Sequence, residues 1–315
     1  MIITVTLNPA MDRLLFVDGF RFDVANRIYR RENCVGGKGT HVSANLVCLG
    51  EKSIATGIAM GETGRQIIES LEALGVACDF IYSTAGDSRT NYILLYGKSS
   101  TLICEKGPDV PKDVLDAFAV HYEQLCKKAG YVIISGDASN FAYGAGASLQ
   151  DKLFETAQLK GARIIFDSAG ASLRSALKHR PYIIKPNAEE LAELTNMPVA
   201  TDQDILCAIK SLAPHDIHII AVSMGSRGSI VKIGSRVFRA GIAKVEAQNT
   251  VGCGDAYLSG LVYAIKNTYT PQRALALAAA CGGAAALNPL SVGFDKDKAF
   301  ALCENISIEE IGEVT

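Results

Sequence analysis

The sequence predicts an α/β fold: a doubly wound, mostly parallel sheet with helices on both faces, plus a small β-sheet. From residue 131 onward, short apolar runs alternate with amphipathic segments across short connections, as in parallel strands linked by helices. The run YVIIS (131–135) is continuously apolar, which is typical of a strand buried on both faces. Hydrophobic residues make up 49% of the 315 residues, enough for a large core.

The elements are expected in the following order along the chain. The N-terminal MIITVTLNP is interpreted as a strand that ends in a turn, and residues 40–49 as a helix. Later strands are predicted at 131–135, 162–168, 182–187 and 218–225, and helices at 149–160, 172–178, 188–194 and 202–212. Gly161 follows the first of these helices, where glycine commonly ends a helix. A strand-like segment at 237–247 leads to a glycine turn and a helix at 256–266.

Two regions interrupt the alternation, at residues 14–34 and 88–105. Their β-type runs, RLLFVDGF in the first and NYILLYG and STLICE in the second, are separated by glycine turns, a pattern typical of hairpins. We expect insertions at about 13–35 and 88–106 to pair into one small sheet that covers the main domain. Because no linker, low-complexity tract or internal repeat is visible, residues 1–315 are predicted to form a single domain.

The composition argues against several kinds of partner. The formal net charge is -2, from 31 basic and 33 acidic residues, so we expect no nucleic-acid partner. The longest apolar stretch, residues 274–287, is shorter than the ~20 residues that span a bilayer and is interpreted as a buried helix. Nine cysteines without a C-x-x-C pair, and an N-terminus without a basic-then-apolar leader, indicate a cytoplasmic protein with reduced thiols.

The stretch NTVGCGDAYLSG, residues 249–260, places two glycines before an acid at the start of a predicted helix. Gly252 and Gly254 allow backbone amides to turn inward, and unpaired amides at a helix N-terminus attract a phosphate group. By itself the pattern fits either an anion site or a simple turn with Asp255 as the N-cap of the helix. It is not a Walker A loop, because no Gly-Lys-Ser or Gly-Lys-Thr follows.

Five stretches along the chain carry a family resemblance. They are TLNPAMD (6–12), VGGKGTHVS (35–43), IKPNAEEL (184–191), VSMGSRG (222–228) and NTVGCGDAYLSG (249–260). In this order they resemble the PfkB/ribokinase superfamily of carbohydrate kinases, in particular its branch of 1-phosphofructokinases and tagatose-6-phosphate kinases. The combination of GGKG near the start and G-x-G-D near the end is specific, and the five stretches span nearly the whole chain.

The resemblance implies a ribokinase-like fold with a β-sheet lid that often forms a dimer contact, so we expect a homodimer. It also implies that the amides of Gly252, Cys253 and Gly254 form an anion hole. Asp255 would be the general base that accepts the proton of a sugar hydroxyl group. Cys253 stands where the family usually has Ala or Ser, but only its backbone amide is needed. In phosphoryl transfer the protein mainly positions groups and neutralises charge.

The N-terminal motifs are expected to bind the sugar. Asp12, at the end of the first βα connection, can accept hydrogen bonds from vicinal hydroxyl groups, with a turn or cap residue as the alternative. Gly37 and Gly39 allow close approach of the backbone to a ligand, and Lys38 supplies a mobile charge or else lies on the surface. His41 stands where the family usually has Asn, and its ring is expected to add a contact to an anionic substrate.

Two arginines match positions where this branch of the family keeps basic residues for the phosphate group of the substrate. Arg89 is expected to act within its own chain, whereas Arg27 either reaches across a dimer or faces solvent. Asp137, in SGDASN (135–140), departs from the SGSLP of relatives. Its carboxylate would repel a phosphate group, bind a hydroxyl group or point away, which leaves the exact sugar open.

The C-terminal half is expected to bind ATP and Mg²⁺. Asn187 and Glu190 are implied to organise Mg²⁺ through water, since this ion prefers oxygen ligands and keeps several waters; the alternative is an N-capping Asn with a surface Glu. Lys185 would neutralise phosphate charge. An apolar adenine pocket is predicted near residues 280–293, which contain no Trp or Tyr. The nucleotide channel would be lined by Ser223, Gly225 and Gly228, although both glycines also fit a hairpin.

Three functions are compatible with these residues. The first is an ATP-dependent kinase for a ketohexose phosphate: fructose 6-phosphate, fructose 1-phosphate or tagatose 6-phosphate. The second is a kinase for an unphosphorylated sugar or nucleoside, against which Lys38, Arg27 and Arg89 argue. The third is a non-catalytic sensor of sugar phosphates or nucleotides, against which the intact Asp255 and the Asn187–Glu190 pair argue. The sequence leaves open the sugar, the acceptor hydroxyl group and any effector.

Overall fold

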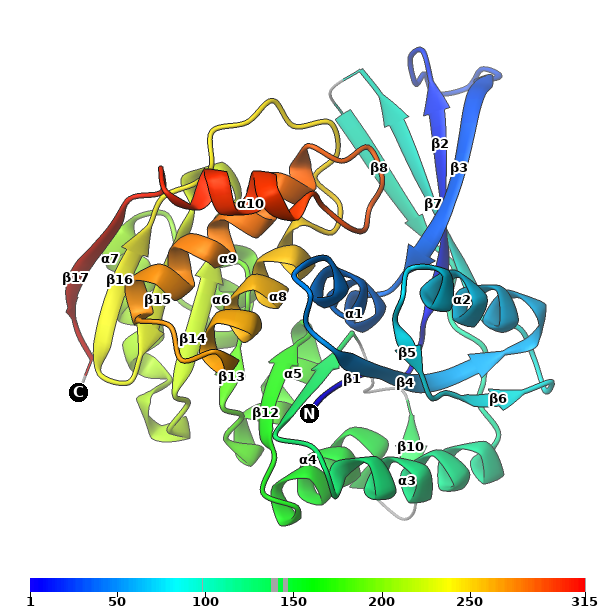
Figure 1. The fold of residues 1–315 in the computed structure, drawn as a ribbon, viewed down its shortest axis with the longest axis horizontal. Coiled ribbons are helices and arrows are strands. Elements are labelled where there is room, and N and C mark those ends of the chain that lie inside the picture. The colour runs from blue at the N-terminus through cyan, green and yellow to red at the C-terminus, as the bar shows by residue number, and fades with distance from the viewer. Residues whose placement is uncertain (98, 137–140, 144–146, 315) are drawn as a thin grey trace.

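The computed structural model describes residues 1–97, 99–136, 141–143 and 147–314. Asp137, for which a place near the sugar was expected, lies outside the described residues. Within the described ranges the chain forms a main sheet, a small sheet and helices on both sides of the main sheet (Figure 1). A two-residue antiparallel pair, β10 (Ala142–Tyr143) with β11 (Ala147–Ser148), is separate from both sheets.

The main sheet has eleven strands in the described residues, in the order β17-β16-β15-β14-β13-β12-β9-β1-β4-β5, with β6 paired to β4. The pairs from β14 through β5 and β6 are parallel, and those joining β14 to β17 are antiparallel. The predicted mostly parallel, doubly wound sheet is therefore confirmed. The strands are β1 (Ile2–Thr6), β4 (Ser53–Met60), β5 (Ala77–Cys78), β6 (Ile81–Ser83), β9 (Tyr131–Ser135), β12 (Arg163–Asp167), β13 (Ile183–Ile184), β14 (Ile219–Ser223), β15 (Ser229–Ile233), β16 (Arg236–Ala240) and β17 (Ile308–Glu313).

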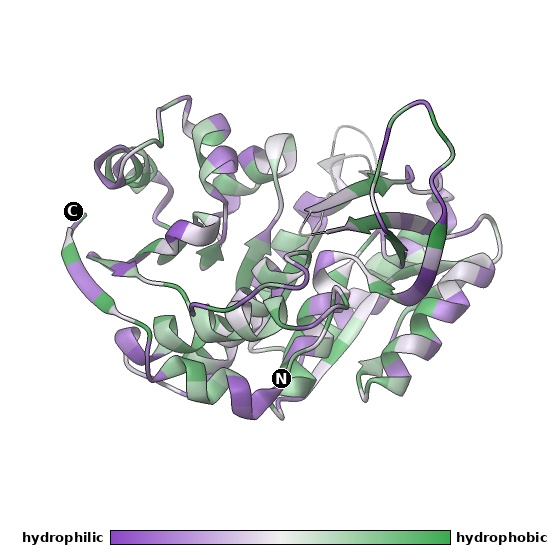
Figure 2. Ribbon diagram, turned by 90° about the horizontal axis from the view of Figure 1, so that it is seen from above, coloured by the Kyte–Doolittle hydropathy of each residue, from purple (hydrophilic) through white to green (hydrophobic). Residues whose placement is uncertain are grey.

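Helices cover both faces of this sheet because neighbouring residues of each buried strand point to opposite sides. On β9, Ile133 packs into the cluster that contains α1, α8, α9 and α10, whereas Ile134 packs into the cluster that contains α3 to α7. Figure 2 shows the interior strands mainly in the hydrophobic colour. The helices are α1 (Lys38–Cys48), α2 (Gly61–Ala73), α3 (Lys112–Cys126), α4 (Leu149–Leu159), α5 (Gly170–Ala176), α6 (Ala188–Thr195), α7 (Asp202–Ser211), α8 (Cys253–Lys266), α9 (Pro271–Ala286) and α10 (Lys296–Cys303).

The small sheet has the order β3-β2-β7-β8 and projects beyond the main sheet (Figure 1). Its strands are β2 (Ala10–Val17), β3 (Ile28–Gly36), β7 (Arg89–Tyr96) and β8 (Ser99–Cys104). The two insertions join where β2 runs parallel to β7. Leu14 and Ile93 are fully buried, and they share a hydrophobic cluster with Ile67 and Leu71 of α2. One end of the small sheet is thereby fixed to the body of the protein.

Most of the predicted elements are present, and the differences have local causes. The helix expected at 172–178 begins earlier, at Gly170, and continues as a 3₁₀ turn, η1 (Leu177–His179). The strand expected at 237–247 ends at Ala240, because the following residues form a loop that lines a cavity. Two further 3₁₀ turns are η2 (Ala213–His215) and η3 (Gly225–Arg227). No helix in the described ranges has both the length and the apolar character needed to cross a membrane.

Two predicted placements near the site are wrong. Asp12 does not end a connection from strand to helix, because the chain enters β2 at Ala10 and Asp12 lies within that strand. The helix expected at 256–266 is α8, which begins at Cys253, so Asp255 lies inside its first turn. The glycine turn is thus continuous with the helix, and Gly252 is the N-cap.

Gly260 lies where α8 packs against α9. A Cβ at this position would lie 2.8 Å from Sγ of Cys281 and 3.0 Å from Cα of Ala278, so the two helices approach closely only because residue 260 has no side chain. Protein interiors are packed so densely that one added methyl group changes stability.

We therefore expect Gly260→Ala to lower the free energy of unfolding by about 1–3 kcal/mol, because an overpacked core forces backbone shifts. Gly19→Ala is the matched control, since a Cβ at Gly19 meets nothing within 4 Å. Its effect is expected within about 0.5 kcal/mol in urea unfolding. An equal loss of stability in both variants would contradict the proposed crowding between α8 and α9.

Candidate functional site

The candidate site lies at the carboxyl ends of the parallel strands, where ligands bind in open sheets of this kind. Asp167 is the last residue of β12, and Ser223 is the last residue of β14. Asn187 forms an isolated parallel bridge with Ser223 at the same edge. The N-terminus of α8 and the inner end of the small sheet complete the site.

The first turn of α8 is shaped by Gly252. Its φ is 83°, and a Cβ there would lie only 1.9 Å from the carbonyl oxygen of Ser291, so any other residue would be both strained and obstructed. The amides of Asp255 and Ala256 donate to the Gly252 carbonyl group. The amides of Cys253 and Gly254 precede them, at the end where a helix attracts anions, and the Cys253 amide donates to the Thr250 carbonyl group at 3.4 Å. Burial raises the pKa of the Cys253 thiol to about 11, so the thiol stays protonated near pH 7.

A buried cluster links Asp255 to the sugar-binding candidates. Nδ1 of His41 lies 2.8 Å from Oδ2 of Asp255, and Nε2 of His41 lies 3.6 Å from Oδ2 of Asp12. Asn91 donates from Nδ2 to Oδ1 of Asp12 at 2.8 Å, and the Ser291 hydroxyl donates to its Oδ2 at 2.9 Å. Asp12, His41, Asn91 and Ser291 are almost fully buried, and Asp255 is 7% exposed.

A second cluster pairs two lysines with one carboxylate. Nζ of Lys38 lies 3.1 Å from Oδ1 of Asp167, and Nζ of Lys185 lies 3.2 Å from its Oδ2. Burial by itself would raise the pKa of Asp167, but the two ammonium groups outweigh it and hold this pKa below its usual range. The Asp167 carboxylate in turn raises the pKa of Lys38. Lys38, expected to be mobile, is therefore held in a defined position.

Lys185 also connects this second cluster to α8. A Cβ on Gly254 would lie 3.5 Å from Nζ of Lys185, so the ammonium group is next to the first-turn amides. Asp167 was missed by the sequence analysis, as were Asn91 and Ser291. A signal for Asp167 was present, because it is the next-to-last residue of a predicted strand, near the edge of the sheet where ligands bind.

Gly37 and Gly39 bring α1 close to the first strand. Gly37 is the N-cap of α1 with a φ of 102°. A Cβ on Gly39 would lie 2.3 Å from Oγ1 of Thr6. The two glycines therefore allow α1 to pack closely on β1. This packing directs Lys38 and His41 toward the site.

Asn187 and Glu190 form a capping box at the start of α6. Oδ1 of Asn187 accepts from the Glu190 amide, and Oε2 of Glu190 accepts from the Asn187 amide, both at 2.8 Å. Asn187 therefore has the N-capping role that was the alternative to Mg²⁺ binding. It also lines the cavity described below. Among the residues that the structure describes, no group of three or more His, Cys, Asp or Glu is arranged to hold a metal ion.

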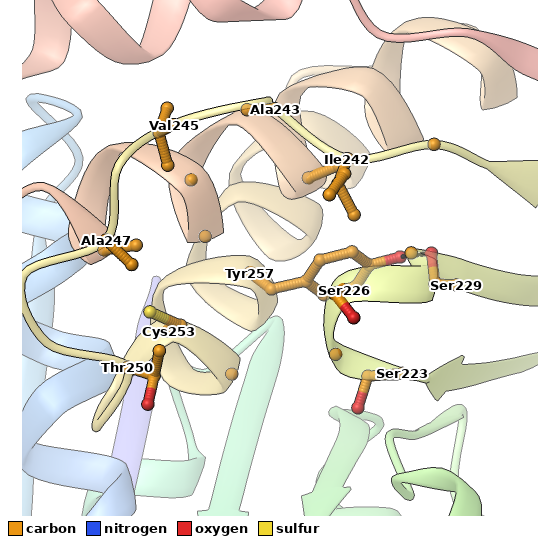
Figure 3. Close-up of a pocket in the computed structure, with 18 of the residues that line it drawn as sticks. Ser223, Ser226, Ser229, Ile242, Ala243, Val245, Ala247, Thr250, Cys253 and Tyr257 are labelled. Carbon is orange, nitrogen blue, oxygen red and sulfur yellow. Dashed lines mark hydrogen bonds between the residues drawn. The ribbon is translucent and has the colours of Figure 1, made fainter. Parts of the chain in front are cut away.

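A cavity of about 500 Å³ extends from the N-terminus of α8 toward α9 (Figure 3). Its walls come from the loop after β16, from α9, from the turn after β14 and from α8. Figure 3 shows Ile242 and Val245 on one wall and Cys253 with Thr250 at the end formed by α8. Other lining residues are Ser223, Gly225, Gly228, Gly282, Gly283 and Ala286.

The expected adenine pocket overlaps this cavity only in part. Of the α9 residues that line it, Gly282, Gly283 and Ala286 fall in the predicted range 280–293 and Ala279 lies just outside it, and the loop after β16 forms the opposite wall. Tyr257 of α8 also lines the cavity, and its hydroxyl group lies 3.0 Å from Oγ of Ser229. Tyr257 lies outside the range 280–293, so no aromatic ring was expected at this cavity from the sequence.

The two arginines lie in different environments. Arg89 is half-buried at the start of β7, where Nη1 donates to Oδ1 of Asn91 at 3.1 Å and Nε donates to the Asn8 carbonyl group at 3.3 Å. Arg27 is exposed in the loop before β3, next to the Val17 end of β2. Asp12 lies five residues from Val17, roughly 17 Å along an extended strand. Arg27 therefore does not join the site of its own chain.

Both ring nitrogens of His41 have partners within the protein. Its Nδ1 faces Asp255, and its Nε2 lies 2.9 Å from the carbonyl oxygen of Val35. Because both ring nitrogens already face protein acceptors, the expected contact with an anionic substrate is not what this structure shows. The ring lies between carboxylates, within the protein.

The chain matches a known family along most of its length. A family model described as "pfkB family carbohydrate kinase" matches residues 5–293. A tagatose-6-phosphate kinase from Staphylococcus epidermidis is 30% identical over 314 residues, covering 99% of this chain and 100% of the relative.

Solved structures have the same fold. A Thermotoga maritima protein described as a "possible 1-phosphofructokinase" is 25% identical, with a TM-score of 0.85 over 98% of this chain and 99% of that one. Phosphofructokinase-2 from Escherichia coli, solved with substrates and products, is 22% identical with a TM-score of 0.87 and coverage of 96% and 98%, which supports the fold alone. The family resemblance is thus confirmed: this chain belongs to the pfkB family of carbohydrate kinases, phosphotransferases with an alcohol group as acceptor.

Proposed function

We propose that this chain is an ATP-dependent kinase that phosphorylates a hydroxyl group of a ketohexose phosphate, of the tagatose-6-phosphate kinase or 1-phosphofructokinase type. The observation that carries the proposal is the place of Asp255. It lies in the first turn of α8, between the cavity that ends at Cys253 and Gly254 and the carboxylate cluster around Asp12. A base at this junction can face both a nucleotide and a sugar. The names of the relatives supply the substrate class.

In the proposed reaction Asp255 accepts the proton of the attacking hydroxyl group. The hydroxyl oxygen forms a bond to the γ-phosphorus as the bond to the β-γ bridging oxygen breaks, and ADP leaves with that electron pair. The amides of Gly252, Cys253 and Gly254 form the anion hole, and Lys185 next to Gly254 offsets negative charge on the phosphoryl group. Asp167 holds Lys185 and Lys38 in place before the substrates bind.

Asp12 is proposed to bind hydroxyl groups of the sugar. Asn91 and Ser291 donate to its two oxygens, and a carboxylate has about four acceptor positions, so it retains room for further donors. Arg89 is proposed to hold the phosphate group of the substrate, because it is tethered to Asn91 and so lies beside the Asp12 cluster. Gly37, Lys38 and Gly39 are proposed to border the same sugar site.

The cavity of about 500 Å³ is proposed to take the nucleoside part of ATP, with Ser223, Gly225 and Gly228 on its edge. Asn187 and Glu190 are oxygen donors of the kind that Mg²⁺ prefers, and their engagement in the capping box favours contact through water. A bound Mg²⁺ would neutralise phosphate charge there. Lys185, held by Asp167 next to the first turn of α8, supplies a further positive charge.

A second copy of the chain is the proposed partner of the small sheet. β3, β8 and the connection between β2 and β3 carry exposed large apolar side chains, part of which a second copy would cover. These are Phe22, Ile28, Tyr29, Leu102 and Ile103. A substrate contact by Arg27 is proposed only in this context, from one copy to the site of the other.

Asp255→Asn is expected to lower kcat by about 10²–10⁴-fold, because the amide cannot accept the hydroxyl proton. ATP affinity, measured by calorimetry, should stay nearly unchanged. Asp297→Asn, an acid in the first turn of α10, is the matched control and should keep full activity. Turnover of Asp255→Asn within about tenfold of the wild type would contradict the role of general base.

Arg89→Ala is expected to raise KM for the phosphorylated sugar by about tenfold to a hundredfold, the value of one lost charged hydrogen bond, with little change in KM for ATP. The assay uses ATP with fructose 6-phosphate, tagatose 6-phosphate and fructose 1-phosphate in turn. Arg65→Ala, on the exposed surface of α2, is the control. If both KM values rise equally, Arg89 does not contact the substrate phosphate group.

Asp167→Asn is expected to lower the free energy of unfolding by about 3–5 kcal/mol at pH 7, because Lys185 loses its partner in a buried site. The pKa of Asp167 is lower in the folded protein, so its contribution is full above the unfolded value near 4 and is lost as pH falls through the folded value. The gap between wild type and variant in urea unfolding should narrow below about pH 4.

The control for this measurement is Asp202→Asn. Asp202 pairs with Arg239 and its side chain is 47% exposed, so the expected cost is no more than about 1 kcal/mol. An equal loss of unfolding free energy in the two variants would contradict the claim that the buried pair of Lys185 and Asp167 stabilises the fold more than an exposed pair does.

A further inference from the structure

Among the described residues, His41 is the only buried side chain in contact with Asp255 that can carry a positive charge. Its surroundings fix its hydrogen-bonding pattern. Nε2 lies 2.9 Å from the carbonyl oxygen of Val35, and Nδ1 lies 2.8 Å from Oδ2 of Asp255. Oδ2 of Asp12 lies 3.6 Å from Nε2. The ring therefore meets an acceptor on each side.

These acceptors determine where the protons lie. A backbone carbonyl oxygen only accepts, so Nε2 must carry a hydrogen atom. An ionised Asp255 also only accepts, so Nδ1 must carry a hydrogen atom as well. A histidine with hydrogen atoms on both nitrogens is an imidazolium ion. A neutral ring would leave the Nδ1 lone pair facing a carboxylate.

We propose that His41 is an imidazolium ion that positions Asp255 and offsets the repulsion between Asp255 and Asp12, which lets the base work at lower pH. In its kinetic part this inference rests on the proposed function. His41 acts through Asp255 and does not itself touch the reacting atoms, so it is a positioning residue.

The balance of burial and charge supports this state. Burial by itself lowers the pKa of an imidazole, but the contacts with Asp12 and Asp255 outweigh it and raise the pKa of His41 well above its usual value. The titratable groups that face the ring are Asp12 from β2, Cys34 from β3 and Asp255 from α8. Lys38, one turn earlier on α1, is paired with Asp167.

The position of the ring also connects it to the anion hole. A Cβ on Gly252 would lie 3.6 Å from Nδ1 of His41, so the ring packs against the N-cap of α8. On the other side, Asn91 joins Asp12 to Arg89. A line of polar contacts thus runs from Arg89, proposed to bind the substrate phosphate, to the proposed base.

The kinetic test compares His41→Asn and His41→Gln with the wild type. The Asn amide reaches the position of Nδ1 and the Gln amide that of Nε2, so each variant keeps one neutral donor and both lose the charge. We expect the acid limb of kcat/KM for the sugar phosphate to move to higher pH by about one unit or more in both, because the neighbouring positive charge is gone. On that limb a one-unit movement is about a tenfold loss of kcat/KM.

The control is His121→Asn. His121 lies on α3 and pairs with Asp79 at 3.1 Å, with its side chain 25% exposed, away from the proposed base. Its pH profile should match that of the wild type. A uniform fall in kcat/KM at every pH in both His41 variants, with the acid limb unmoved, would overturn the proposal in favour of a purely structural role.

The protonation state is tested separately by ¹⁵N NMR of the imidazole nitrogens in the wild type. The chain has five histidines, so the His41 signals are those lost in His41→Asn. We expect both nitrogens to stay protonated well above pH 6.5, and the midpoint to fall toward 6.5 in Asp255→Asn. A neutral ring at pH 7 in the wild type would overturn the inference whatever the kinetics show.

The two experiments separate this inference from the proposed function. If no sugar phosphate is turned over, the proposed function fails, whereas the NMR measurement still decides the charge of His41. If turnover depends on Asp255 but His41 is neutral, the proposed function stands and the inference fails.

Discussion

The geometry of the site depends on the way α8 begins. Gly252 adopts a left-handed backbone conformation directly against the Ser291 carbonyl oxygen, a position that only glycine can occupy without a clash. From that point the chain turns at once into a helix, and Asp255 is carried into its first turn. The base candidate, the first-turn amides and the end of the cavity are therefore placed by one turn of backbone, not by three independent loops.

Two buried charge clusters flank this turn, and each combines carboxylates with cations. In the first, on the side proposed for the sugar, His41 lies between Asp12 and Asp255. In the second, Asp167 lies between Lys38 and Lys185. Groups held in place in a poorly solvated site need not reorganise as charge develops, which is how electrostatic catalysis gains most of its effect. A buried cluster of this kind is costly if any member is missing, because the remaining charge loses both water and partner.

The small sheet contributes polar groups from neighbouring strands. Asp12 and Asn91 are partners in the register between β2 and β7, and Arg89 lies two residues from Asn91 on the same face of β7. Hydrogen bonds along the sheet therefore fix the spacing of the sugar-binding candidates. Fully buried Leu14 and Ile93 attach the same strands to α2, so this end of the sheet is part of the body of the protein.

The parallel sheet, the two insertions and the segments proposed to carry the chemistry could be predicted from the amino-acid sequence. Continuous apolar runs and glycine motifs are local features, and local propensity is enough to recognise them. The contacts between distant side chains could not be predicted in this way, because they form only when the chain packs. Lys38 and Asp167 are separated by 129 positions and His41 and Asp255 by 214, so no local pattern could show that these charges pair. Burial, which strengthens the electrostatic interaction within each pair, is also a property of the packed chain, because it comes from helices and strands that are far apart in the sequence.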